Sequence, residues 1–410
     1  MILNRIWIGM FLIAFVVAVS KLIFLQDLDI FKDLVDALMG SATTGFEISL
    51  SLTGIICLWM GIMKIGENGG SVKILTRLVS PLFSRLFPEV PKEHPAVGSM
   101  MMNFSANMLG LDNSATPLGL KAMKELQELN PEKETASNAQ IMFLVLNTSG
   151  LTIIPVTIFA YRAGSESPTA VFLPILIATF IASLGGLIYV SIRQKINLFN
   201  KVILAYVGTA TLLIGSLLYY VVNHPENGDV ISKVGGNVTI FLIVISFIGL
   251  AARRKVNVYE SFIDGAKDGF SVAISIIPYL IAMLAAIAVF RASGALDILL
   301  DGIKMLAIYA GLTVTEWIDA LPVAFMKPLS GSGARGAYLE VMSHYGVDSM
   351  QEKIAATFQG STETTFYVLA VYFGSVKIRN TRYAVTAGLI ADFIGIVSAI
   401  FISYLFYAHG

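Results

Sequence analysis

Charged residues are scarce in this chain of 410 residues, and the two signs are balanced. Lys and Arg together number 28, Asp and Glu number 28, and charged residues make up 14% of the sequence. A soluble domain carries roughly 25% charged residues, so this chain cannot cover a water-facing surface of ordinary composition. The solvent is expected to be lipid. Zero net charge also removes the basic footprint that nucleic-acid binding requires, and no nucleic-acid partner is expected.

Cysteine and histidine are also scarce. The single cysteine, Cys57, excludes a disulfide within the chain and a thiolate metal cluster. The 4 histidines form no HExxH pair. No GxxxxGK[ST] motif is present, and the GxGxxG match at Gly331–Gly336 follows no strand, so nucleotide hydrolysis and dinucleotide binding are disfavoured. Because no nucleophile and base pair recurs either, we expect that the protein is not an enzyme and holds no metal or organic cofactor.

Hydrophobic residues make up 56% of the sequence and form continuous runs of about 20 residues, the length that a helix needs to cross a bilayer. Continuous rather than alternating apolarity excludes a transmembrane β-barrel. The predicted fold is therefore an all-α polytopic membrane protein. Complete spans are expected near 6–24, 48–65, 138–161, 169–192, 201–222, 234–252, 271–290, 352–376 and 383–406. Amphipathic helices are expected at 27–38, 72–87 and 295–309, and two apolar stretches, 95–129 and 317–342, are interrupted by Gly, Pro or Asn.

Basic residues mark the loops that are expected on the cytoplasmic side. They cluster at 193–201, 253–255 and 377–382, whereas the loops 164–167 and 223–229 carry few cations and are placed outside. This assignment of loops to the two sides of the membrane is consistent along the chain if each interrupted stretch enters and leaves on the same side, as a re-entrant hairpin does. We therefore expect a multi-pass protein of the bacterial inner membrane, with a cytoplasmic N-terminus and an external C-terminus.

The two halves of the sequence resemble each other. Leu176–Ala182 matches Leu389–Gly395, and the same offset places Asn147–Gly150 on Gly360–Glu363. By the charge rule, equivalent spans of the two halves cross the membrane in opposite directions. The sequence thus predicts two inverted-topology repeats, each with a re-entrant hairpin and a broken transmembrane helix. An additional helix near 201–222 allows the second repeat to start on the opposite side.

Small polar residues gather at four interruptions of these helices. In a membrane, such breaks survive only where they are buried in protein or line a wet cavity, and in secondary transporters their freed backbone groups bind the solute. Close helix packing is the alternative for any one break, but the recurrence in repeat-related pairs weakens it. We predict one solute site near the midplane, formed by Asn103, Asn107, Asn113, Ser114, Asn147, Thr148, Ser149, Lys327, Ser330, Ser332, Arg335, Gln359, Ser361, Thr362 and Glu363.

Ionisable residues at membrane depth are costly and usually functional. Lys327 and Arg335 flank one break, and a cation pair beside helix N-termini favours an anionic group on the solute. Snorkelling of both cations to the interface is the alternative. Glu363, Asp392 and Asp112 are candidates for a carboxylate that couples transport to a proton or a sodium ion, and a structural ion pair with a buried Lys or Arg is the alternative for Glu363 and Asp392.

Several of these strings resemble known families. Asn103–Met123 and Asn147–Pro155 resemble the bacterial spore maturation protein A family, and Pro322–Gly336 with Gln359–Gly374 resembles the spore maturation protein B family. The resemblance covers nearly the whole chain and implies a natural fusion. Its expected parts are a protein A-like gate repeat at 1–195, a linking transmembrane helix and outer loop at 196–232, and a protein B-like gate repeat at 233–410.

The resemblance implies a gate, or nucleoside recognition, domain in each half. This domain name is shared with concentrative nucleoside transporters and with the membrane part of bacterial ferrous iron transporters, and it does not establish a substrate. Iron is disfavoured because the breaks contain no Cys or His and no GTP-binding domain is attached.

We expect an inner-membrane secondary transporter or flippase that moves a polar, anionic solute or lipid headgroup through one central site between the two gate repeats. The alternative is a non-transporting membrane component that regulates or scaffolds an envelope or spore-maturation process. Both leave a homo-oligomer open. A solvent-connected cavity between the four breaks would favour transport.

Overall fold

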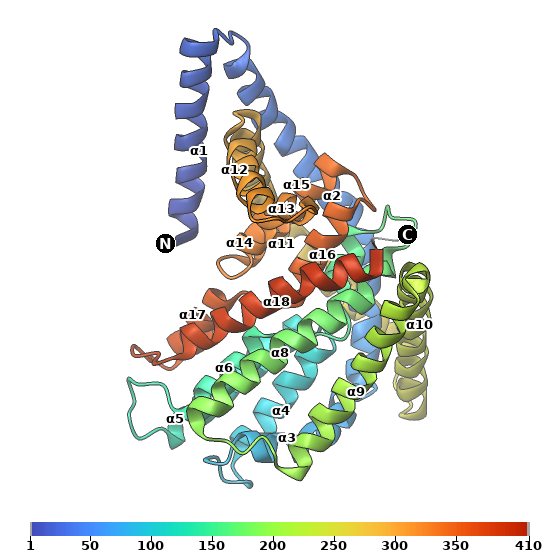
Figure 1. The fold of residues 1–410 in the computed structure, drawn as a ribbon. Helices are drawn as coiled ribbons and strands as arrows, with labels where there is room; N and C mark the ends of the chain where they lie inside the picture. The colour runs from blue at the N-terminus through green and yellow to red at the C-terminus, as the bar shows by residue number, and fades with distance from the viewer. Residues whose placement is uncertain (1, 408–410) are drawn as a thin grey trace.

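The computed structural model describes residues 2–407, with side chains at 4–111, 115–224 and 226–407. Its regular elements are helices, and Thr135 and Asn380 form one isolated bridge (Figure 1). The first half contains α1 (Ile2–Ser20), η1 (Lys21–Leu25), α2 (Ile30–Asn68), α3 (Ser71–Leu86), α4 (Pro95–Met108), α5 (Asp112–Leu129), α6 (Asn138–Thr148), α7 (Val156–Tyr161), η2 (Pro168–Val171) and α8 (Phe172–Gln194). The chain continues with α9 (Lys201–Asn223), η3 (Pro225–Asn227), α10 (Gly228–Arg253), α11 (Val258–Ala292), α12 (Ala295–Tyr309), α13 (Glu316–Asp319), α14 (Leu321–Met326), α15 (Gly331–Tyr345), α16 (Met350–Ser361), α17 (Thr365–Ser375) and α18 (Ala384–Tyr407).

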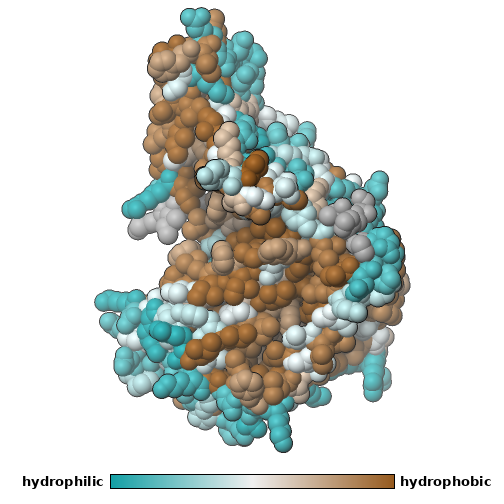
Figure 2. Space-filling view, in the orientation of Figure 1, coloured by the Kyte–Doolittle hydropathy of each residue, from teal (hydrophilic) through white to brown (hydrophobic). Residues whose placement is uncertain are grey.

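Seven helical segments of the described range are long and apolar enough to cross a membrane. They are Asn4–Leu25, Ile30–Asn68, Pro168–Gln194, Lys201–Asn223, Gly228–Arg253, Val258–Ala292 and Ala384–Tyr407. Figure 2 shows hydrophobic residues across the face formed by α8 and α18, with hydrophilic residues gathered at its edges. The fold class is confirmed as an all-α polytopic membrane protein.

Two helix boundaries differ from the prediction. The expected amphipathic helix at 27–38 and the span at 48–65 are one continuous helix, α2, of 39 residues. The prediction was wrong because a change in hydropathy was taken for a boundary, although no Pro stops the helix there and the helix continues through this segment. Similarly, the span expected near 234–252 belongs to α10, which already begins at Gly228.

Helices from the two halves pack against each other as antiparallel pairs. In the α2–α11 pair, a Cβ atom added at Gly45 would lie 2.9 Å from Ile281, and one added at Gly269 would lie 2.8 Å from Cys57. Gly45 and Gly269 have the same separation in the chain as Cys57 and Ile281, so the two contacts are those that a two-fold relation between the halves produces. Small residues allow this close approach of the backbones.

The α8–α18 pair follows the same rule. Gly186 approaches Ala391, and Gly395 approaches Ala182, which shows that the two helices run in opposite directions. These helices lie side by side in Figure 1. Opposite directions are what an inverted repeat requires of equivalent helices. The orientation of the halves relative to the bilayer stays a prediction, and the C-terminal residue Gly410 lies outside the described range.

The helix interruptions occur in both halves and two of them touch. They fall between α4 and α5, α6 and α7, α14 and α15, and α16 and α17. The Glu363 backbone N–H donates to the Thr148 carbonyl over 2.8 Å, which joins the breaks after α6 and α16. Gly150, at the first of these breaks, has a φ of +51°, and a Cβ atom there would lie 2.8 Å from Glu363. The two helix breaks therefore lie directly against each other.

Candidate functional site

Two cavities lie beside this contact between the breaks, since Glu363 lines both of them. One has a volume of about 350 Å³ and the other about 860 Å³. Lys327, Arg335, Gln359 and Glu363 line both of them. These four residues come from the α14–α15 connection, the first turn of α15, the end of α16 and the break that follows it. The cavities thus meet at one polar junction, which we call the central junction.

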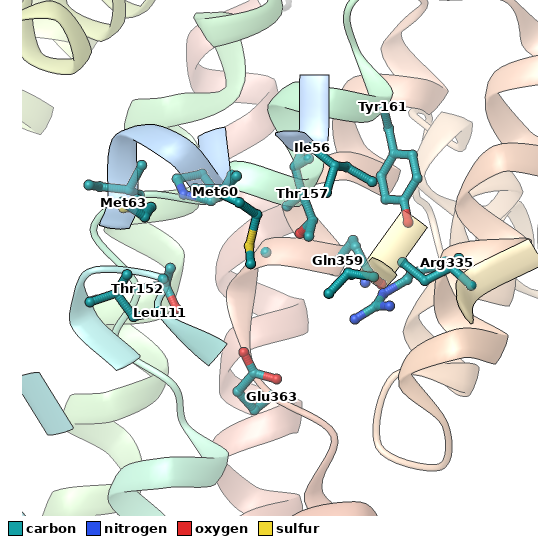
Figure 3. Close-up of a pocket in the computed structure, with 18 of the residues that line it drawn as sticks. Ile56, Met60, Met63, Leu111, Thr152, Thr157, Tyr161, Arg335, Gln359 and Glu363 are labelled. Carbon is teal, nitrogen blue, oxygen red and sulfur yellow. The ribbon is translucent and has the colours of Figure 1, made fainter. Parts of the chain in front are cut away.

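The first cavity is formed mainly by α2, α11 and the break between α6 and α7 (Figure 3). Its wall is mixed, with apolar residues such as Met60 and Met63 beside the ion pair of Lys64 and Glu67, whose atoms lie 3.1 Å apart. Asp268 of α11 adds a further charge. Figure 3 shows Met60 of α2, Thr157 of α7 and Gln359 of α16 around one space.

The second cavity is formed by the α14–α15 hairpin tip and one side of α17. Ser330 and Ser332 line it, and their hydroxyl oxygens lie 3.2 Å apart. The Ser330 hydroxyl also accepts a hydrogen bond from the Gly333 N–H, so this serine caps α15. Such a cap fixes the start of the helix, whose remaining N–H groups favour negative charge in the cavity.

Polar groups at the central junction are available to a ligand. Among the described residues, Arg335 forms no hydrogen bond or ion pair, and the side chain of Glu363 is exposed to the cavities without such a partner. Gln359 is only 7% exposed, yet its amide oxygen has no hydrogen-bond partner among the described residues. Figure 3 shows Arg335, Gln359 and Glu363 around the same space. A buried polar atom without a partner is unfavourable unless a ligand or water completes its bonding.

The asparagines of the first half form a bonded network. Asn107 donates to the Asn147 side-chain oxygen over 2.7 Å, and the Tyr372 hydroxyl donates to the same oxygen over 3.3 Å. Asn103 donates to the Ala115 carbonyl over 2.8 Å. Asn107 and Asn147 line the second cavity, whereas Asn103 is fully buried one helical turn away. The network joins the first hairpin to α6 and to α17 of the second half.

Most other residues of the predicted site lie beside the breaks and outside both cavities. Thr148, Ser149 and Ser361 are buried there, whereas Thr362 lines the first cavity. Asp392 is buried beneath the second break, and its carboxylate accepts a hydrogen bond of 2.7 Å from the Thr365 hydroxyl. Side chains at a helix break point in several directions, so residue type alone did not separate these positions from the cavity wall. The side chains of Asp112, Asn113 and Ser114 lie outside the described residues.

The sequence prediction missed several residues of the cavity wall. Lys64 lies in the span expected at 48–65, whereas Glu67 and Asp268 lie outside the expected spans, in parts of α2 and α11 that the prediction left out. No interruption of these helices marks the positions. The sequence signal for these positions was their i, i+3 and i, i+4 spacing to other residues of the cavity wall. This spacing does not identify a cavity, because any amphipathic helix shows it.

A buried charged cluster holds the two halves together at one end of the broken helices. Arg162 and Glu352 are both 0% exposed and form an ion pair, and Arg162 also lies 2.7 Å from Asp348. Partial burial alone would raise the pKa of Asp348, but hydrogen bonds from the Ser165 hydroxyl and the Glu166 N–H, together with Arg162, lower it below its usual value. Asp348 therefore stays ionised beside the guanidinium.

The described residues contain no group of three or more His, Cys, Asp or Glu that could hold a metal ion. The fold and the cavities define a class of protein. It is a multi-pass membrane protein with two similar halves, whose broken helices enclose polar cavities lined by cations. Residues 49–164 match the family described as "Gate: Nucleoside recognition".

Comparison with known proteins confirms the resemblance drawn from the sequence. Spore maturation protein A of Bacillus subtilis (strain 168) is 37% identical over 197 residues, which are 47% of this chain and 97% of that protein. Spore maturation protein B of the same organism is 42% identical over 166 residues, which are 40% of this chain and 91% of that protein. The chain belongs to the spore maturation protein A and B family and fuses relatives of both in one polypeptide. No solved structure matches it.

Proposed function

We propose that the protein is a secondary transporter or flippase of the bacterial inner membrane that moves a polar, anionic solute through the central junction. The observation that carries this proposal is that the same four residues line two separate cavities. A solute bound to these residues could be reached from either cavity, as alternating access around a fixed site requires. In this proposal the protein is not an enzyme and needs no metal or organic cofactor.

The charge of the junction supports an anionic group on the solute. Arg335 has no ion-pair partner among the described residues, and Lys327 is present at both cavities. A guanidinium binds carboxylate or phosphate oxygens through two parallel N–H donors. The capped N-terminus of α15 lies beside these cations, since Ser330 and Arg335 line the same cavity.

A coupling ion would act at Glu363. This carboxylate reaches both cavities, whereas Asp392 is 2% exposed and hydrogen-bonded to Thr365. A site that exchanges a proton or a sodium ion must be accessible, and Glu363 meets this requirement. Asp392 is enclosed, and its second carboxylate oxygen has no hydrogen-bond partner among the described residues. The N-terminus is placed in the cytoplasm in this proposal, by the distribution of basic loops.

Replacing Gln359 by Ala is expected to weaken solute binding and uptake by roughly three-fold to ten-fold, the effect of one lost neutral hydrogen bond. A thermal-shift screen of purified protein against nucleosides, phosphates, amino acids and lipids would first identify the solute. Uptake into vesicles and the unfolding midpoint would then be measured for Gln359→Ala and for Gln351→Ala, a control on the same helix outside both cavities.

Unchanged uptake in Gln359→Ala would contradict the assignment of the junction as the binding site. A wild-type protein that binds a solute but never moves it would favour the scaffold alternative. Asn147→Ala is a less informative variant, because it would also leave Asn107 and Tyr372 without their shared hydrogen-bond acceptor.

A further inference from the structure

A third cavity lies where α8 ends and α18 begins, away from the central junction. Its volume is about 680 Å³, and its lining includes Arg193, Arg382 and Tyr383. Both guanidinium groups lie over the Tyr383 ring, at 5.1 Å for Arg193 and 5.2 Å for Arg382. We call this cavity the basic pocket, and we propose that it binds the phosphate of an anionic phospholipid headgroup.

The two cations of the basic pocket lack a carboxylate partner. Within the described residues, neither Arg193 nor Arg382 forms an ion pair with an acidic side chain. Arg382 is held in place by a hydrogen bond of 3.0 Å from its guanidinium to the Ala136 carbonyl, which leaves its other N–H groups to the cavity. Two arginines fixed on one aromatic ring form a positive site whose natural counterion is an anion with several oxygens.

The opposite end of the same helix pair provides a contrast. There, near the start of α8 and the end of α18, Arg162 is paired with Glu352 and Asp348. Lys353 lies 4.8 Å from the centre of the Tyr407 ring at that end. Arg162 at one end of the α8–α18 pair is thus neutralised by carboxylates of the protein, whereas Arg193 and Arg382 at the other end have the Tyr383 ring and a backbone carbonyl as their partners. The fold leaves one end open for an external anion.

Apolar surface continues from the basic pocket along both helices. Ile192 lines the pocket and is 69% exposed, and Ile188 follows one turn away on α8. On α18, exposed Phe393 lies two turns beyond Thr386, which also lines the pocket, so the two share a helix face. Cations at the ends of membrane-spanning helices with exposed apolar residues beside them match a headgroup with attached acyl chains. A soluble phosphate would use the cations alone.

The position of the pocket agrees with lipid at headgroup depth. Pro168–Gln194 and Ala384–Tyr407 are both long enough to cross the membrane, and the pocket lies at one terminus of each. Figure 2 shows hydrophilic residues at the left edge of the molecule, where these termini lie in Figure 1. Basic pockets between transmembrane helices on the cytoplasmic side are suited to anionic headgroups.

Lipid binding would be tested by native mass spectrometry of the full chain in neutral detergent. Phosphatidylglycerol is expected to bind wild type more tightly than phosphatidylcholine, and the double variant Arg193→Gln with Arg382→Gln is expected to bind it about ten-fold to thirty-fold more weakly. The control is Lys195→Gln with Arg379→Gln, which removes the same charge near the end of α8 and the start of α18 but outside the pocket. It should bind within about two-fold of wild type.

Equal loss in the double variant and the control would overturn the proposal, because the attraction would then be a general surface charge. Equal binding of phosphatidylcholine, or displacement of phosphatidylglycerol by millimolar inorganic phosphate, would also overturn it. If the double variant fails to fold, Arg193→Gln alone decides, since this side chain makes no hydrogen bond within the described residues. Unchanged phosphatidylglycerol binding in that single variant would contradict the site.

Discussion

Replacing Arg162 by Met is expected to lower the free energy of unfolding by about 3–5 kcal/mol. Arg162 and Glu352 are both 0% exposed, and the variant would leave the Glu352 carboxylate buried without its cation. Two hydrogen bonds would remain, from the Tyr338 hydroxyl at 2.6 Å and from the Asp348 backbone N–H at 3.3 Å. The measurement is the denaturation midpoint of the purified protein in detergent.

The double variant Arg162→Met with Glu352→Gln is expected to recover at least about half of this loss, because a neutral amide costs far less to bury than a lone carboxylate. The first half of the chain already has a neutral amide at the position that corresponds to the Glu352 carboxylate. Gln140 and Glu352 occupy the same position after the capping serines Ser137 and Ser349. Arg162→Met with a stability within about 1 kcal/mol of wild type would show that the cluster does not hold the halves together.

Replacing Arg335 by Gln is expected to weaken binding of an anionic solute by about ten-fold to a hundred-fold, which corresponds to the loss of a charged hydrogen bond worth roughly 1.5–3 kcal/mol. A neutral analogue should be affected little. The unfolding midpoint should be nearly unchanged, because Arg335 makes no hydrogen bond or ion pair with the described residues. Binding of both ligands would be measured by calorimetry.

Arg77→Gln provides the matched control, since this exposed arginine of α3 lies outside the cavities. Lys327→Met should act in the same direction, but Lys327 is nearly buried, so its removal also changes packing. If wild type and Arg335→Gln bind the anionic solute equally well, Arg335 does not contact the solute and only extends toward water.

The fold followed from the sequence where one physical rule dominated. Bilayer thickness sets the length of apolar runs, and the polar strings near Ser330 and Gln359 interrupt their helices as expected. The sequence did not predict that 27–38 and 48–65 form one helix, α2. Polar residues inside a long helix are stabilised by the helix packed against it, here α11. Gly45, packed against Ile281 of α11, is part of that contact, which no local pattern reveals.

The site was predictable in type but not in full composition. Lys327, Arg335, Gln359 and Glu363 were expected from their charge or polarity beside a break, and they form the central junction. Asn103 shares a helix face with Asn107 but lies one turn deeper, so only the three-dimensional fold separates their surroundings. Asp268 was missed because it lies in an unbroken helix, α11, and no local sequence pattern shows that this face of the helix lines the cavity.

The central claim, that one site can be reached from both faces of the membrane, is tested most directly by labelling a cysteine at the junction. Because Cys57 is the single native cysteine, Cys57→Ala provides a clean background for Gln359→Cys. Lys195→Cys and Asn223→Cys would mark opposite faces as controls. We expect a membrane-impermeant maleimide to label Gln359→Cys from either face, and the bound solute to slow labelling from both. Labelling from only one face, with the controls reacting from opposite faces, would contradict the transport mechanism.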